Sequence, residues 1–115
     1  MAQHNSVQTQ RVLIFGGRGF MGQNLLALYP GATTPHVDIA DAPAVAAALD
    51  AARPDVVINC AGKTGRPNID WCENHKLETI RANLTGALVV LEECLRRGVY
   101  LVHFSSGCIY EGESA

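Results

Sequence analysis

The chain has no cluster of basic residues and no long apolar run among its 115 residues. Nine lysines and arginines against eleven aspartates and glutamates give a formal net charge of -2. Nucleic acids and membrane surfaces are usually bound by clustered positive charge, so neither is expected as a partner. Because no apolar stretch approaches the roughly 20 residues that cross a bilayer, we expect no membrane span.

The four cysteines form no C-x-x-C pair, and the first ten residues lack the charged start and apolar centre of a signal peptide. We therefore expect reduced thiols, a cytoplasmic protein and no metal site. Cys60 and Cys94 fall within apolar patterns, where a free cysteine is usually a small core residue. The length fits one domain, with residues 1–10 as a flexible N-terminus and residues 11–115 as the folded part.

The folded part alternates short apolar runs with helical patterns. Strands are expected at residues 12–15, 56–60 and 99–104, with a brief extended stretch at 36–39. Helices are expected after residue 20 until Pro30, after Asp41 until Pro54, and from Leu77 to Arg97. In the last of these, an apolar stripe is predicted from residues at steps of three and four: Leu77, Ile80, Leu84, Ala87, Leu88, Leu91 and Leu95.

Strands that alternate with helices predict an α/β fold, a Rossmann-like doubly wound parallel sheet. Ligands of such sheets bind beyond the carboxyl ends of the strands. Three segments lie there: "GGRGFMG", "AGKTGRPNIDWC" and "SSGCIY".

Gly16, Gly19 and Gly22 form G-x-x-G-x-x-G directly between a predicted strand and a predicted helix. This spacing permits a sharp turn and lets a pyrophosphate reach the amides of the helix N-terminus, so a dinucleotide site is predicted. The alternative is a flexible connector. Since "YPGATTPH" offers no acid for ribose hydroxyls and Arg18 could meet a 2′-phosphate, NADP(H) is favoured over NAD(H). Arg18 could instead be a solvated loop residue.

Five features in order resemble the extended short-chain dehydrogenase/reductases: the glycine turn, Asp38-Ile39, "NCAG", Asn83 in "RANLTGALVVLEEC", and "SSGCIY". The segment "GRPNIDWCENHKLETIRAN" is especially similar to the sugar-nucleotide reductases of rhamnose synthesis. The resemblance covers Arg11 to Gly112 and implies an N-terminal, NAD(P)-binding part of such an enzyme.

The resemblance also implies individual roles. Asp38 would bind the adenine amino group, Ile39 would flank the ring, and Asn83 would hold a helix distortion and a water. The structural alternatives are Asp38 as a turn former and Asn83 as a polar interruption of the helix. The full set of implied cofactor-binding residues is Gly16, Arg18, Gly19, Phe20, Met21, Asp38, Ile39, Ala61, Gly62, Lys63 and Asn83.

Ser106 matches the family's catalytic serine or threonine, whose hydroxyl hydrogen-bonds the developing alkoxide. The family's proton-donating Tyr-x-x-x-Lys is absent, because no tyrosine here has a lysine four residues later. We therefore expect this chain to be inactive alone and to be the front of a longer reductase of nucleotide-linked 4-keto-6-deoxy sugars, which could be a homodimer. Candidate contacts to the nucleotide sugar are Thr64, Arg66 and Asn68, although a solvated loop would also contain them. The second hypothesis is a non-catalytic NAD(P)-binding regulatory module.

Overall fold

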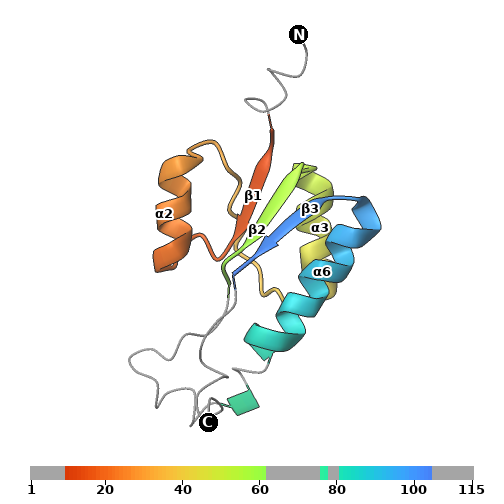
Figure 1. Cartoon of the computed structure of the whole chain (residues 1–115). Coiled ribbons are helices and arrows are strands. Elements are labelled where there is room, and N and C mark those ends of the chain that lie inside the picture. The colour runs from red at the N-terminus through yellow and green to blue at the C-terminus, as the bar shows by residue number, and fades with distance from the viewer. Residues whose placement is uncertain (1–9, 62–75, 78–80, 105–115) are drawn as a thin grey trace.

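The computed structural model describes residues 10–61, 76–77 and 81–104, and the strands among them form one parallel sheet (Figure 1). The strands are β1 (Val12–Phe15), β2 (Val56–Asn59) and β3 (Tyr100–His103), hydrogen-bonded in the order β1-β2-β3. Phe15 pairs with Asn59, and Asn59 pairs with His103. The carboxyl ends of all three strands are therefore level with one another.

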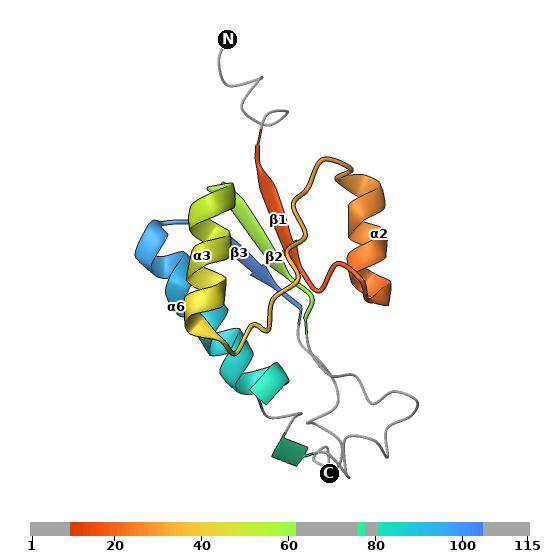
Figure 2. The same ribbon diagram turned by 180° about the vertical axis from the view of Figure 1, so that it is seen from behind.

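Helices cover both faces of this sheet. The helix α2 (Phe20–Leu28) lies on one face, and α3 (Ala42–Ala52) and α6 (Gly86–Arg97) lie on the other (Figures 1 and 2). This arrangement confirms the predicted doubly wound α/β fold. None of the helices in the described part of the chain is long and apolar enough to cross a bilayer.

The helix α3 begins and ends where its sequence predicts. Asp41 Oδ1 accepts a hydrogen bond from the Ala44 amide at 3.2 Å, and Pro43 occupies the first turn, where no amide donor is needed. Arg53 ends the helix in the left-handed region with φ 49°. The helix α6 ends in the same way at Gly98, with φ 65°, where glycine has no Cβ to strain.

The core lies between the sheet and the helices α3 and α6. Leu13, Phe15 and Val57 from the strands are almost completely buried. They belong to one apolar cluster with residues from the segment before α3, from α3 and from α6, namely Ile39, Val45, Leu49, Val90 and Cys94. The interpretation of Cys94 as a small core residue is confirmed, whereas Cys60 is only partly buried and lies outside this cluster.

The brief extended stretch predicted at residues 36–39 does not become a strand of the sheet. β1 has β2 on one side, and on its other side Thr33 is the only described residue that pairs with it. The Thr33 amide donates to the Val12 carbonyl at 2.9 Å, and the Thr33 carbonyl accepts from the Ile14 amide at 2.8 Å. Pro35 follows two residues later and has no amide hydrogen to continue such a ladder. The chain then runs as an irregular segment toward α3.

The helix predicted from Leu77 to Arg97 is confirmed over α6, but its predicted apolar stripe is not the side that the helix buries. Gly86, Val90 and Cys94 are the residues that α6 buries, at successive steps of four. The stripe's leucines within this helix, together with Leu84 just before it, are 43–71% exposed: Leu84, Leu88, Leu91 and Leu95. The buried side of α6 therefore carries small residues, of which Val90 and Cys94 belong to the core cluster.

Candidate functional site

The turn between β1 and α2 is a closely packed structure in which two glycines are required. Gly16 has φ +83°, and a Cβ built there would lie 2.6 Å from the Ala61 nitrogen. A Cβ on Gly22 would overlap the carbonyl oxygen of Gly16. These two glycines are needed for the turn itself and for the approach of α2 to it.

Gly19 differs from both. Its φ of -79° is accessible to any residue, and the nearest atom to a Cβ placed there is Gly16 O at 3.7 Å, an ordinary contact. The protein's own packing therefore does not require a glycine at this position. A glycine here leaves space directly in front of the N-terminus of α2.

No described side chain caps the backbone amides at the N-terminus of α2. Gly19 is the N-cap residue and supplies no side-chain acceptor, and the first turn contains no acidic residue. The first amides of a helix cannot bond within it, so those of Phe20 and Met21 are available to an anion. Both of these side chains are exposed, at 77% and 42%.

A cavity of about 390 Å³ opens beside this turn. Its lining comes from the turn, from the segment after Thr33 and from the end of β2, and consists of Gly16, Gly17, Arg18, Gly19, Thr34, Pro35, His36, Val37 and Ala61. Four predicted cofactor residues, Gly16, Arg18, Gly19 and Ala61, therefore meet at one cavity. Its size lies within the range of roughly 300–1,000 Å³ that is usual for small-molecule sites.

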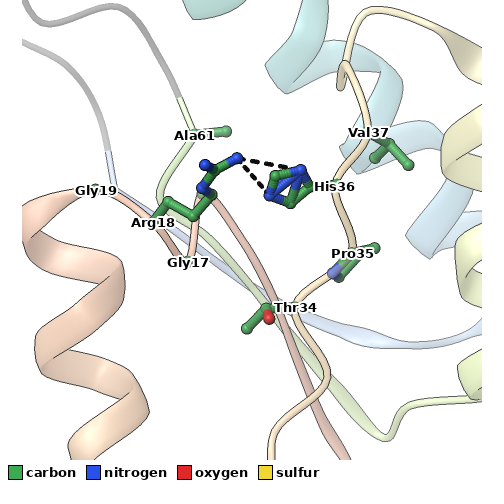
Figure 3. Close-up of a pocket in the computed structure, with 9 residues that line it drawn as sticks. Gly17, Arg18, Gly19, Thr34, Pro35, His36, Val37 and Ala61 are labelled. Carbon is green, nitrogen blue, oxygen red and sulfur yellow. Dashed lines mark hydrogen bonds between the residues drawn. The ribbon is translucent and has the colours of Figure 1, made fainter.

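Arg18 and His36 point toward one another across this cavity (Figure 3). Arg18 Nη1 lies 2.8 Å from His36 Nε2 and 3.3 Å from His36 Nδ1. Gln23 Nε2 donates to the Arg18 carbonyl at 2.8 Å and holds the backbone of the turn. His36 was not identified from the sequence, because no local motif marks it.

Asn59 is a second residue that sequence reasoning missed. It is 0% exposed at the end of β2, and its Oδ1 accepts from the Ala61 amide at 3.0 Å. Its Nδ2 lies 3.3 Å from His103 Nδ1 in the neighbouring strand. The buried amide therefore fixes the backbone where β2 leads into the cavity wall.

The predicted adenine contacts lie just beyond the cavity. Asp38 is exposed, and its Oδ1 accepts from the Ala40 amide at 3.0 Å, which supports its interpretation as a turn former. Ile39 is 4% exposed and belongs to the core, so little of its side chain is open to a ring. Their roles toward adenine stay predictions.

Asn83 lies within η1 (Arg81–Thr85), a π-helical turn that leads directly into α6. The helix is therefore distorted where the resemblance implies a distortion, and π-turns are frequent at functional sites. The remaining predicted site residues lie outside the described residues: Gly62, Lys63, Thr64, Arg66, Asn68 and Ser106.

Both described cysteines are free thiols, and burial raises the pKa of each. For Cys94 the pKa rises to about 11. A thiol held protonated at neutral pH is a poor nucleophile. Neither of these two cysteines is therefore a candidate for covalent catalysis.

Similar proteins share this part of the fold. A bifunctional dTDP-4-dehydrorhamnose 3,5-epimerase/dTDP-4-dehydrorhamnose reductase of Arabidopsis thaliana is 38% identical over 98% of this chain, but the match spans only 39% of that protein. The crystal structure of the L780 UDP-rhamnose synthase from Acanthamoeba polyphaga mimivirus has a TM-score of 0.76 and 27% identity, covering 90% of this chain and 39% of that one. A UDP-glucose 4-epimerase of Thermus thermophilus in complex with NAD gives a TM-score of 0.65 and 27% identity, covering 77% and 35% of the respective chains.

The chain thus spans about two fifths of the length of the Arabidopsis relative. The predicted resemblance to reductases of rhamnose synthesis is confirmed. A family model described as the RmlD substrate binding domain matches residues 10–115, and the chain belongs to this family.

Proposed function

We propose that this chain is the cofactor-binding part of an NADP(H)-dependent reductase of nucleotide-linked 4-keto-6-deoxy sugars. The observation that carries the proposal is the space at Gly19. Two glycines of the turn are required by the protein's own packing, but Gly19 is not. A glycine that packing does not need, placed at a helix N-terminus beside an open cavity, is accounted for by the close approach of a ligand.

The residues of the turn suit the pyrophosphate of a dinucleotide. Free amides at the start of α2 offer hydrogen bonds and the positive end of the helix dipole. Arg18 adds a formal positive charge within the same cavity. The adenosine half would then lie along the segment from His36 to Asp38. No acidic residue lies between the glycine turn and Asp38, so the sequence there offers no carboxylate to bind the ribose hydroxyls or to repel a 2′-phosphate.

The substrate class rests on the relatives. The Arabidopsis protein is named for dTDP-4-dehydrorhamnose, and the mimiviral structure for UDP-rhamnose. We therefore propose a nucleotide-linked 4-keto sugar as substrate, with dTDP as the first nucleotide to test. A cytoplasmic location is part of the proposal, supported by the two described cysteines being free thiols.

Bound NADPH would supply the hydride for reduction of the sugar ketone. Ser106 would donate a hydrogen bond to the oxygen that becomes negatively charged, a contribution usually of about 10² to 10³ in turnover. Asn83 would hold a water beside the same oxygen from the π-helical turn. Because no Tyr-x-x-x-Lys occurs in these residues, the 115-residue chain itself is proposed to lack the proton donor and to be inactive.

Calorimetric titration of the 115-residue chain with NADPH and NADH tests the binding claim. We expect weak binding that is tighter for NADPH, with Arg18→Gln reducing the preference. Arg11→Gln is the matched control, since Arg11 is an exposed arginine beside Asp55 and lines a different cavity. Folded protein that binds neither cofactor at millimolar concentration would overturn the proposal.

A further inference from the structure

The guanidinium of Arg18 lies against the face of the His36 ring. A single nitrogen, Nη1, is 2.8 Å from Nε2 and 3.3 Å from Nδ1 of that ring (Figure 3). The two ring nitrogens point in different directions within the ring plane, with a C–H group between them, so one atom in that plane cannot be this close to both. Nη1 therefore lies above the plane, where the π electrons of an aromatic ring attract a cation.

The backbone that carries the ring is fixed by the fold. Thr33 pairs with β1 through two hydrogen bonds, of 2.9 and 2.8 Å, which place the segment that leads to His36 beside the glycine turn. The two segments also pack closely, because a Cβ built on Gly17 would lie 2.8 Å from Thr34 Cγ2. Pro35 then restricts the backbone directly before His36. The place of the ring is thus set by the backbone.

Arg18, in contrast, has a long and exposed side chain. Such a side chain has many rotamers, and binding a ligand with it costs the entropy of fixing one of them. Among the described residues that line the cavity none is acidic, so no carboxylate restrains or neutralises the guanidinium there. The contact with His36 uses only Nη1, which leaves the donors on Nε and Nη2 for a ligand.

We propose that His36 is the positioning residue for Arg18: its ring holds the guanidinium at the cavity, where the remaining donors meet the 2′-phosphate of NADP(H). The inference rests on the proposed dinucleotide site and adds a specificity-determining residue to it. Holding a charged donor in place before the ligand arrives raises affinity, because less entropy is lost on binding. The gain favours the phosphorylated cofactor, since an unphosphorylated ribose offers Arg18 only an uncharged hydroxyl.

The test compares 2′,5′-ADP with 5′-AMP, which differ only in the 2′-phosphate and need only the adenosine half of the site. Calorimetry gives the dissociation constant of each ligand, and the ratio of the two constants measures the preference for the 2′-phosphate. His36→Phe keeps an aromatic face without ring nitrogens, whereas His36→Asn keeps a hydrogen-bonding group without a ring. Both are made in the wild type and in Arg18→Gln. Arg11→Gln, at an exposed arginine of the other cavity, is the control for a change of net charge.

We expect His36→Phe to keep the preference of the wild type and His36→Asn to reduce it about two- to fivefold, the scale of a cation–π contact at an exposed site. Arg18→Gln should reduce the preference as well. In the Arg18→Gln background, His36→Asn should have no further effect, because the ring then has no guanidinium to hold. A merely structural role of His36 would instead weaken both ligands alike and would persist in that background.

With both ligands binding, three results would overturn the role of His36 alone. They are an unchanged preference in His36→Asn, an equal loss of preference in His36→Phe and His36→Asn, and a loss in His36→Asn that persists without Arg18. An unchanged preference in Arg18→Gln would overturn the 2′-phosphate contact itself and the role of His36 with it. Failure of both ligands to bind the folded wild type would overturn the dinucleotide site as well.

Discussion

Asn59 and His103 occupy paired positions at the ends of β2 and β3, and Asn59 Nδ2 lies 3.3 Å from His103 Nδ1. The same buried amide accepts from the Ala61 amide through its Oδ1. One side chain thus links two strand ends to the backbone against which Gly16 packs. The buried side-chain amide of Asn59 therefore stabilises the backbone that forms the cavity wall at Ala61.

Replacing Asn59 by leucine should destabilise the fold by about 1–3 kcal/mol, because the Ala61 amide loses its acceptor in a buried position. Chemical denaturation gives the free energy of unfolding for both proteins. His103→Leu is the control for the contact between the strands alone and should cost less. If Asn59→Leu and wild type had equal free energies of unfolding, the Asn59 amide would not stabilise the backbone at Ala61.

Gly19→Val should abolish cofactor binding while leaving the melting temperature close to that of wild type, because the proposal puts the pyrophosphate in front of Gly19, where a Cβ makes only an ordinary contact with Gly16 O. Gly22→Val should instead unfold the protein, since its Cβ would overlap Gly16 O. Gly31→Val is the control, as a Cβ there meets nothing within 4 Å. Thermal melts and NADPH titrations of the three variants separate these effects. Normal binding by folded Gly19→Val would contradict the assigned ligand position.

Val90→Ala should cost about 1–3 kcal/mol, because Val90 is completely buried and its loss leaves a cavity beneath α6. Leu88→Ala, on the exposed side of the same helix, should change stability by no more than about 0.5 kcal/mol. Both free energies of unfolding are measured by urea titration. A larger loss of stability in Leu88→Ala than in Val90→Ala would indicate that the leucine stripe is the buried face.

Cys94 should make stability fall at alkaline pH. Burial raises the pKa of its thiol to about 11 in the folded state, whereas in the unfolded chain it ionises near the ordinary value of 9.0. Between these two pH values the unfolded state loses its proton and the folded state keeps it, so folding is disfavoured as pH rises. Cys94→Ala should therefore show a shallower loss of stability than wild type over this interval. Identical slopes in the two proteins would exclude this contribution.

The parts of the fold that could be predicted from sequence are those set by local chemistry. Asp41 and Pro43 mark the start of α3, and the glycine turn follows its strand directly. The face that α6 buries could not be read from its leucines. Helical periodicity supplies two candidate faces here, and the structure buries the one that carries Gly86, Val90 and Cys94.

The site was predictable where its residues are adjacent in sequence and not where folding brings them together. Arg18 belongs to the glycine motif and was identified with it. His36 lies 18 residues away and reaches Arg18 only because the segment after Thr33 returns alongside β1. Asn59 belongs to the "NCAG" feature, but its structural role could not be predicted, because its register with His103 appears only once the strands pair.

Backbone amide chemical shifts recorded during an NADPH titration of the isotope-labelled chain test the central claim most directly. We expect saturable shifts at Gly17, Arg18, Gly19 and Ala61, which line the cavity at the carboxyl ends of the strands. The amides of Arg53 and Val99, which line the cavity formed by Arg11, Leu49, Asp50, Arg53, Pro54, Arg97 and Val99, should remain unchanged. Shifts confined to Arg53 and Val99, or none at millimolar NADPH in a folded protein, would contradict the dinucleotide site.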